Sequence, residues 1–136
     1  MAVTALPIFA QTPVFTVGQT ITTANTAKDG TGTVVLLYTA GLNGSRVDNI
    51  KVRSTGTAVA TVIRIFVNNG AVNSTATNNS LYIEATIAAT TLSEVAALAD
   101  NVIAMNLSLP ATYRVYATIG TTVATALQVS AAGGDY

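Results

Sequence analysis

Residues 102–119 read VIAMNLSLPATYRVYATI, and this stretch indicates the fold class. Apolar side chains fall on every second residue of Ile103–Leu109 and again of Tyr113–Ile119. Alternate side chains of a β-strand point to opposite faces, so a period of two predicts strands that each bury one face. Pro110 and its neighbours form a turn signal between the two runs. The sequence therefore predicts two consecutive strands joined by a short turn.

The same alternation extends along the chain and predicts eight or nine strands. They are expected near residues 14–22, 33–39, 46–54, 58–67, 81–88, 92–97, 102–109, 113–119 and 126–132. Short strands at this spacing are typical of a sandwich or jelly roll, and 136 residues make one domain. We therefore expect an all-β, single-domain antiparallel β-sandwich of jelly-roll type. An N-terminal arm is expected at residues 1–13, and the sandwich at residues 14–136.

Gly56-Thr57 fits a two-residue type II′ hairpin turn, because glycine accepts the positive φ that this turn needs at its first position. Such a turn places Ile50 opposite Ile63 on one face of the hairpin. The same register puts the basic side chains of both strands on the other face: Lys51, Arg53 and Arg64.

Two structures are open for residues 91–98. Thr91 to Glu94 resemble a helix capping box, and Leu92, Val95, Ala96 and Leu98 fit one face of a short helix. The neighbouring strands favour an extended chain instead. The domain is therefore expected to contain at most one short helix.

Two predicted strands lack a polar face. Residues 34–38 are apolar on both sides, and residues 62–67 are nearly so. A sandwich strand buries only one face against the opposite sheet. The second face must therefore meet a loop or arm of the same chain, another subunit or another protein. The apolar N-terminal residues Leu6, Ile8 and Phe9 are candidates for this cover.

The charge balance argues against several functions. The chain has six basic and six acidic residues, so its formal net charge is zero, and it has no His and no Cys. A protein that binds nucleic acid usually carries a basic excess. The acidic residues are scattered singly, so no carboxylate pair or calcium-binding motif is visible. We therefore expect no catalytic residue, no cofactor, no metal site, no nucleic-acid partner and no enzymatic activity.

The hydropathy of the chain is high, with a mean of +0.51. Its longest apolar tract is Val34–Tyr38, far short of the roughly 18 residues of a spanning helix. No basic segment followed by an apolar stretch stands at the N-terminus, so no signal peptide is expected. The sequence therefore predicts no membrane partner.

Several segments resemble a known family of short phage and prophage proteins. They are Gly44–Asp48, Ile50–Thr57, Arg64–Val67, Leu81–Glu84, Leu107–Val115, Ile119–Thr121 and Gly133–Tyr136. The likeness spans about residues 30–136 and is to capsid decoration (cement) proteins of jelly-roll type. Its motifs are structural rather than catalytic.

The resemblance implies a structural virion protein. Such proteins bind the major capsid protein on the outside of an icosahedral phage head, commonly as homotrimers, and brace the shell. The expected location is therefore the outer capsid surface of a virion, after assembly in the host cytoplasm. The candidate capsid or subunit contacts are Leu6, Ile8, Phe9, Val34, Leu36, Tyr38, Arg46, Arg64, Phe66, Tyr82 and Tyr116.

Other functions fit the same fold class. A carbohydrate-binding adhesin or lectin-like module of a phage tail or fibre is the main alternative, although it would be expected to cluster aromatic residues with acids or calcium. A coat protein that packages nucleic acid would carry a basic arm, whereas the first 27 residues contain no Lys or Arg. The basic residues of the predicted hairpin also fit a solvated sheet face, where charges discourage edge pairing.

Overall fold

The computed structural model of the chain describes residues 9–125 and 127–136. In this part of the chain the only helical element is a 3₁₀ turn, η1 (Ala76–Asn78), and there are nine strands. They are β1 (Thr12–Phe15), β2 (Gln19–Ile21), β3 (Val35–Thr39), β4 (Ser45–Ser54), β5 (Thr61–Asn68), β6 (Asn79–Ile87), β7 (Asn101–Leu109), β8 (Arg114–Ile119) and β9 (Leu127–Asp135). Among the described residues, none lies in a helix long and apolar enough to be a membrane span.

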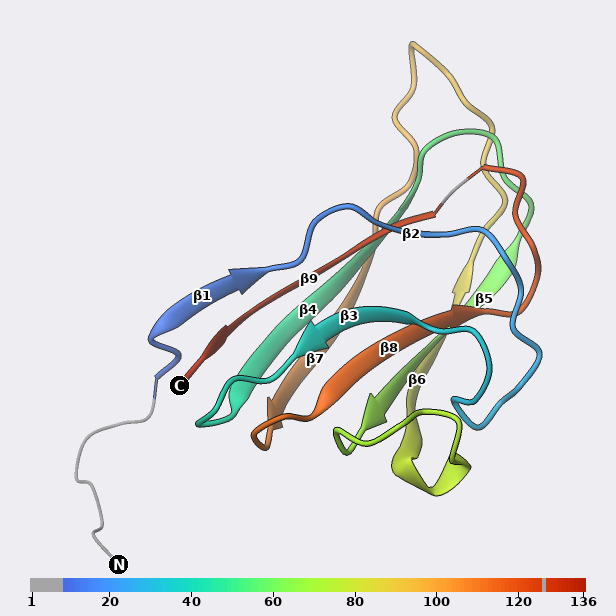
Figure 1. Cartoon of the computed structure of the whole chain (residues 1–136). Coiled ribbons are helices and arrows are strands. Elements are labelled where there is room, and N and C mark those ends of the chain that lie inside the picture. Colours follow the sequence, from blue (N-terminus) through green and yellow to red (C-terminus); the bar gives the residue numbers. More distant parts are fainter. Residues whose placement is uncertain (1–8, 126) are drawn as a thin grey trace, which may run out of the picture.

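The strands form two antiparallel sheets that pack against each other (Figure 1). Sheet A has the order β1-β9-β4-β7, and β2 pairs with the other end of β9. Sheet B has the order β3-β8-β5-β6. The prediction of an all-β antiparallel sandwich is therefore confirmed.

The hydrophobic core lies between the two sheets. Val52 of β4, Ile63 of β5 and Ile119 of β8 are completely buried there. The alternation of burial predicted over residues 102–109 is confirmed, because Ile103 is buried in β7 whereas its neighbour Val102 is 61% exposed. Strand β8 differs, because the side chains on both of its faces are buried. A period of two thus separates the core face from the outer face of each sheet.

The hairpin predicted at Gly56 is wrong. Strand β4 pairs with β7 and β9 in sheet A, and β5 belongs to sheet B, so Ile50 lies opposite Ile103 and not opposite Ile63. Gly56 does not adopt a positive φ, which a type II′ turn requires at that position. Its carbonyl instead accepts a hydrogen bond from the Thr90 hydroxyl (2.8 Å). The chain therefore crosses here from one sheet to the other.

Two further segments differ from the strand prediction. The strand expected over residues 14–22 is divided into β1 and β2, with Gly18 at a φ of +73° between them. Residues 92–97 form neither the expected strand nor a helix. Strand β1 begins at Thr12, within the segment predicted as the arm. Nine strands result because the division of one predicted strand offsets the loss of another.

Candidate interaction surfaces

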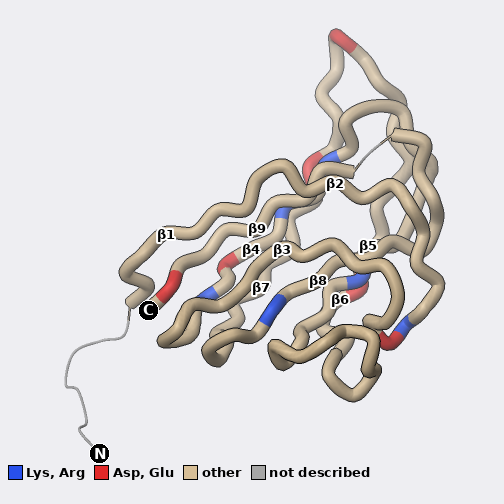
Figure 2. The backbone as a smooth tube through the Cα atoms, in the orientation of Figure 1, with Lys and Arg blue, Asp and Glu red and all other residues tan. Residues whose placement is uncertain are grey.

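The few charged residues are spread over several strands and loops (Figure 2). Within residues 9–125 and 127–136, no group of three or more acidic side chains is placed to hold a metal ion. Exposed apolar side chains lie on the outer faces of the two sheets and on the loops at the two ends of the molecule.

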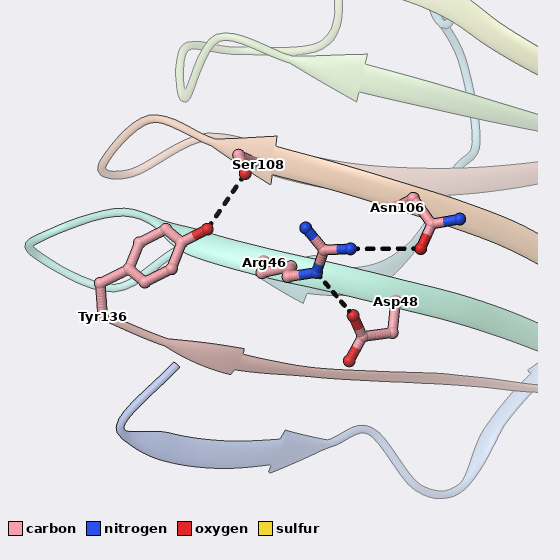
Figure 3. A network of polar contacts seen from close by, with 5 residues as sticks. All are labelled: Arg46, Asp48, Asn106, Ser108 and Tyr136. Atoms are coloured by element: carbon pink, nitrogen blue, oxygen red, sulfur yellow. Dashed lines mark hydrogen bonds and ion pairs between the residues drawn. The ribbon is translucent and has the colours of Figure 1, made fainter. Parts of the chain in front are cut away.

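The outer face of sheet A carries a polar network around Arg46 (Figure 3). The guanidinium donates to Asp48 (2.9 Å) and to the Asn106 amide oxygen (3.3 Å). Nearby, the hydroxyls of Ser108 and Tyr136 are hydrogen-bonded (3.0 Å). Arg46 is exposed, as expected of a candidate contact, but its charge is balanced by Asp48.

A shallow groove of about 250 Å³ lies on the same face of sheet A. We call it the Phe15 groove, after the exposed Phe15 that lines it together with Val17, Lys51 and Arg53. Both cationic side chains contact Asp100, at 3.0 Å from Lys51 and 2.9 Å from Arg53. The groove thus combines an apolar side with two positive charges that share one carboxylate.

Part of the outer face of sheet B is covered by a loop of the same chain, residues 22–34. At one end of the sheet the Asn25 N–H donates to the Ile119 carbonyl at the end of β8 (2.8 Å). At the opposite end the Asn79 side chain donates to the Asp29 carbonyl (3.2 Å). The loop therefore passes along the sheet between these two anchors.

A second loop closes over the same face. It is the loop of residues 69–78, which contains η1 and which we call the η1 loop. The side chain of Asn73 in this loop donates to the carbonyls of Gly30 (3.3 Å) and Gly32 (3.0 Å), and Figure 1 shows the two loops side by side. The Asn68 side chain, on the same face as Phe66, donates to Asn79 (2.8 Å). The sequence left open whether a loop or arm of the same chain, another subunit or another protein covers this face. The structure shows a loop of the same chain.

Four candidate contacts are buried as a result of this packing or within the core. Tyr38 is 2% exposed, Arg64 8%, Phe66 0% and Tyr116 8%. Arg64 and Tyr116 lie on the outer face of sheet B, and the sequence predicted a cover over residues 62–67 but left open which segment supplies it. Buried side chains of this kind stabilise the domain and do not offer a surface to a partner.

Arg64 is the buried charge of sheet B. Its Nε donates to Glu84 on the neighbouring strand (2.9 Å), and the two side chains are 10% and 49% exposed. Among the described residues, the Arg64 Nη1 and the hydroxyl of Thr118 are buried without a hydrogen-bond partner. Thr118 lies directly opposite Arg64 in the register of β5 and β8. Glu84 is therefore the counterion that makes a buried guanidinium tolerable here.

The remaining candidate contacts are dispersed. Leu36 and Tyr82 are exposed on the outer face of sheet B, Val34 is half-buried before β3, and Phe9 is exposed at the N-terminal end. Leu6 and Ile8 lie outside the described residues. The structure therefore does not bring the predicted contacts together into one site.

Leu42 is an exposed apolar residue that the sequence reasoning missed. It lies in the tight turn of residues 41–44, closed by a hydrogen bond from the Gly44 N–H to the Gly41 carbonyl (3.0 Å), and it is 91% exposed. Gly44 has a φ of +86°, which favours glycine. Asn-Gly pairs are typical of turns, so Asn43-Gly44 marks this turn in the sequence, and Leu42 is the large apolar residue beside it.

Buried hydrogen bonds beneath this turn fix its position. The carboxylate of Asp135 accepts from the Ser45 hydroxyl and from the Tyr38 hydroxyl (3.3 Å). The Gly41 N–H donates to the same Ser45 oxygen (2.9 Å). The turn that carries Leu42 is thus tied to β3, β4 and β9, and Leu42 is presented from a rigid base.

Burial raises the pKa of Tyr38 to about 12 from 10.0, and the nearby Asp135 carboxylate acts in the same direction. Between these values the unfolded chain loses the Tyr38 proton while the folded chain keeps it. The free energy of unfolding should therefore decrease by on the order of 2 kcal/mol as the pH rises from 10 to 12. Tyr38→Phe should remove this loss in urea unfolding across that range. Tyr82→Phe, at an exposed position, is the matched control, and an unchanged pH slope in Tyr38→Phe would contradict the assignment.

Residues 88–99, which we call the finger, project from the opposite end of the molecule (Figure 1). Val95 is 97% exposed and Leu92 is 54% exposed. Between residues 88 and 99 the only charged residue is Glu94. The sequence suggested a strand or a helix here, and the apolar composition that suggested both belongs instead to an exposed loop.

The chain matches no protein-family model, no curated protein and no solved structure in the comparisons with known proteins.

Proposed function

We propose that the chain is a structural virion protein, a decoration protein that binds the major capsid protein on the outside of an icosahedral phage head. The resemblance of residues 30–136 to this family motivates the proposal. The sandwich has few charges and displays apolar side chains on anchored loops. These properties suit a structural protein that binds neighbouring capsid subunits. In the proposal the chain acts as a homo-oligomer, with a trimer favoured.

Leu42 is the observation on which the capsid contact rests. An aliphatic side chain that is 91% exposed on an anchored turn can be buried by a partner with little loss of backbone conformational entropy. Phe9 is 72% exposed, and two residues further along the chain the Gln11 N–H donates to the carbonyl of Asp135 (2.7 Å), whose side chain lies beneath the Leu42 turn. The end of the molecule that carries the Leu42 turn is therefore the proposed capsid-facing end, and binding at many symmetric positions multiplies a modest contact.

Cosedimentation with undecorated phage heads tests this function. The wild-type chain should bind to saturation, and electron cryomicroscopy should show regular density on the outer shell. Leu42→Asp should weaken head binding by about 30-fold, because it removes apolar burial and places a charge in the contact.

Val72→Asp is the matched control, since Val72 is a 65% exposed apolar residue of the η1 loop. It should bind heads like the wild type. Absence of head binding by the wild-type chain would contradict the proposed function. Equal binding by Leu42→Asp would show that the capsid contact lies elsewhere.

The carbohydrate-binding alternative has one supporting observation. Phe15 is 63% exposed beside the polar side chains of Gln128 and Ser130 in the Phe15 groove. Aromatic rings next to polar groups are suited to contacts that need both an apolar face and hydrogen bonds. A glycan screen tests this alternative, which would take first place if a glycan bound and heads did not.

A further inference from the structure

The finger departs from the usual chemistry of an exposed loop. Loops ordinarily carry Gly, Pro, Asn, Asp and Ser. Residues 88–99 contain no Gly, Pro, Asn or Asp, and eight of the twelve are Ala, Leu or Val. An apolar tip that stands in solvent points to an interaction surface.

Several contacts hold the finger in one conformation. The Ser93 hydroxyl accepts from the N–H groups of Val95 (3.2 Å) and Ala96 (3.1 Å). At the base, Thr90 pairs with Ala58 through two backbone hydrogen bonds of 3.0 Å and 2.9 Å. A preformed tip binds with a smaller entropic cost than a flexible one.

The finger is also tied to the crossing between β4 and β5 and to β4 itself. The Leu92 N–H donates to the Thr57 hydroxyl (3.0 Å), and the Leu98 carbonyl accepts from the Arg53 guanidinium (3.4 Å). Asp100, next to the base, contacts Lys51 and Arg53. These contacts aim the tip away from the body of its own chain.

The tip has a single charge. Glu94 is the one charged residue between residues 88 and 99. Among the described residues Glu94 has no ion-pair partner. A surface that accepts the tip should therefore be apolar and carry one compensating positive charge.

The Phe15 groove has these properties. Phe15 and Val17 are 63% and 69% exposed along it. Lys51 and Arg53 contribute two positive charges and Asp100 one negative charge, which leaves one net positive charge. A volume of about 250 Å³ is below the roughly 300–1,000 Å³ of small-molecule pockets. The groove is thus suited to a few side chains and one further carboxylate.

We propose that the finger of one copy of the chain docks in the Phe15 groove of a second copy. Val95 and Leu92 then pack against Phe15 and Val17, and Glu94 lies beside the cations of the groove. The contact supplies the subunit interface of the proposed oligomer, and in that respect the inference rests on the proposed function. Because the two surfaces differ, the contact is heterologous and closes into a ring, such as a trimer, when the rotation between copies permits.

A membrane is the less favourable occupant of the finger. Segments that bind a membrane surface carry aromatic anchors and basic residues. Residues 88–99 contain neither, and Glu94 is repelled by anionic lipid headgroups.

Charge reversal on the full-length chain tests the proposal by sedimentation velocity. The wild-type chain should self-associate. Glu94→Arg should weaken association by about tenfold or more, and so should Arg53→Glu, because each places like charges in the contact. The double variant Glu94→Arg/Arg53→Glu should regain association, since the pair is restored with the signs exchanged.

Arg53→Glu also removes contacts within its own chain, so Val95→Asp is the second probe. Val95 is 97% exposed and its replacement should leave the unfolding midpoint unchanged while abolishing association. Val72→Asp is again the exposed control and should associate like the wild type. A monomeric wild-type chain, or a Val95→Asp chain that associates normally, would overturn the proposal.

Head binding separates this inference from the proposed function. A wild-type chain that binds heads but stays monomeric in solution would overturn the docking of the finger alone. A chain that associates through the finger but binds no head would contradict the capsid role and leave the docking intact. Vesicle binding that depends on Val95 would favour the membrane as the occupant.

Discussion

Gly133→Ala should destabilise the sandwich by about 3 kcal/mol or more. A Cβ atom on Gly133 of β9 would lie 2.1 Å from the carbonyl oxygen of Arg46 and 3.0 Å from the Cα of Val47. Both atoms belong to the backbone of β4, so no side-chain rotation can relieve the clash. Strand β4 cannot retreat either, because β7 pairs with its other edge.

Urea unfolding followed by circular dichroism measures this effect. Gly18→Ala is the control, because Gly18 has a φ of +73° but nothing within 4 Å of its Cβ position. It should cost about 1 kcal/mol from backbone strain alone. A Gly133→Ala chain that is as stable as the Gly18→Ala chain would show that β4 and β9 separate more easily than their pairing indicates.

Glu84→Gln should reduce the free energy of unfolding by about 2–3 kcal/mol. It removes the counterion of Arg64 and leaves the 10% exposed guanidinium without a charged partner. Breaking a buried pair by removing one partner typically costs about 3–5 kcal/mol, and the partial exposure of Glu84 lowers that figure.

Two comparisons distinguish burial of charge from loss of a contact. Asp48→Gln breaks the pair with Arg46, in which both side chains are about half exposed, and should cost less than about 1 kcal/mol. Arg64→Met should also cost less than Glu84→Gln, because it removes the buried charge and leaves a carboxylate that water can solvate. If Arg64→Met proved more damaging than Glu84→Gln in urea unfolding, packing would outweigh electrostatics at this position.

The strands were predictable where the signal is local. A period of two assigns the faces of β7 and β8 without reference to the rest of the chain, and Ile103 and Val115 are buried as it requires. The Gly56 segment failed because a two-residue turn and a crossing between sheets use the same local residues. In the structure the Gly56 carbonyl is bonded to Thr90, which is 34 residues away, and the local pattern carries no sign of this contact.

The cover of sheet B could not be read from the sequence for a similar reason. It depends on the side chains of Asn25, Asn73 and Asn79, which donate to backbone carbonyls of the loop over that face. The residues next to an asparagine in the sequence do not indicate which distant backbone carbonyl its side chain will bind. The burial of Arg64 and Tyr116 follows from that long-range choice, whereas their placement on the outer face follows from the local alternation.

The pairing of β1 with β9 determines how the molecule responds to tension. Thr12 lies opposite Asp135, so the first and last strands meet at the same end of their shared ladder. A force that pulls these two residues apart loads the hydrogen bonds of this pair one after another, because they run perpendicular to the strands. Strand β1 then peels away at low load, while β9 stays paired with β4 along its length. The first strand can thus yield as an extensible tether without unfolding the sandwich.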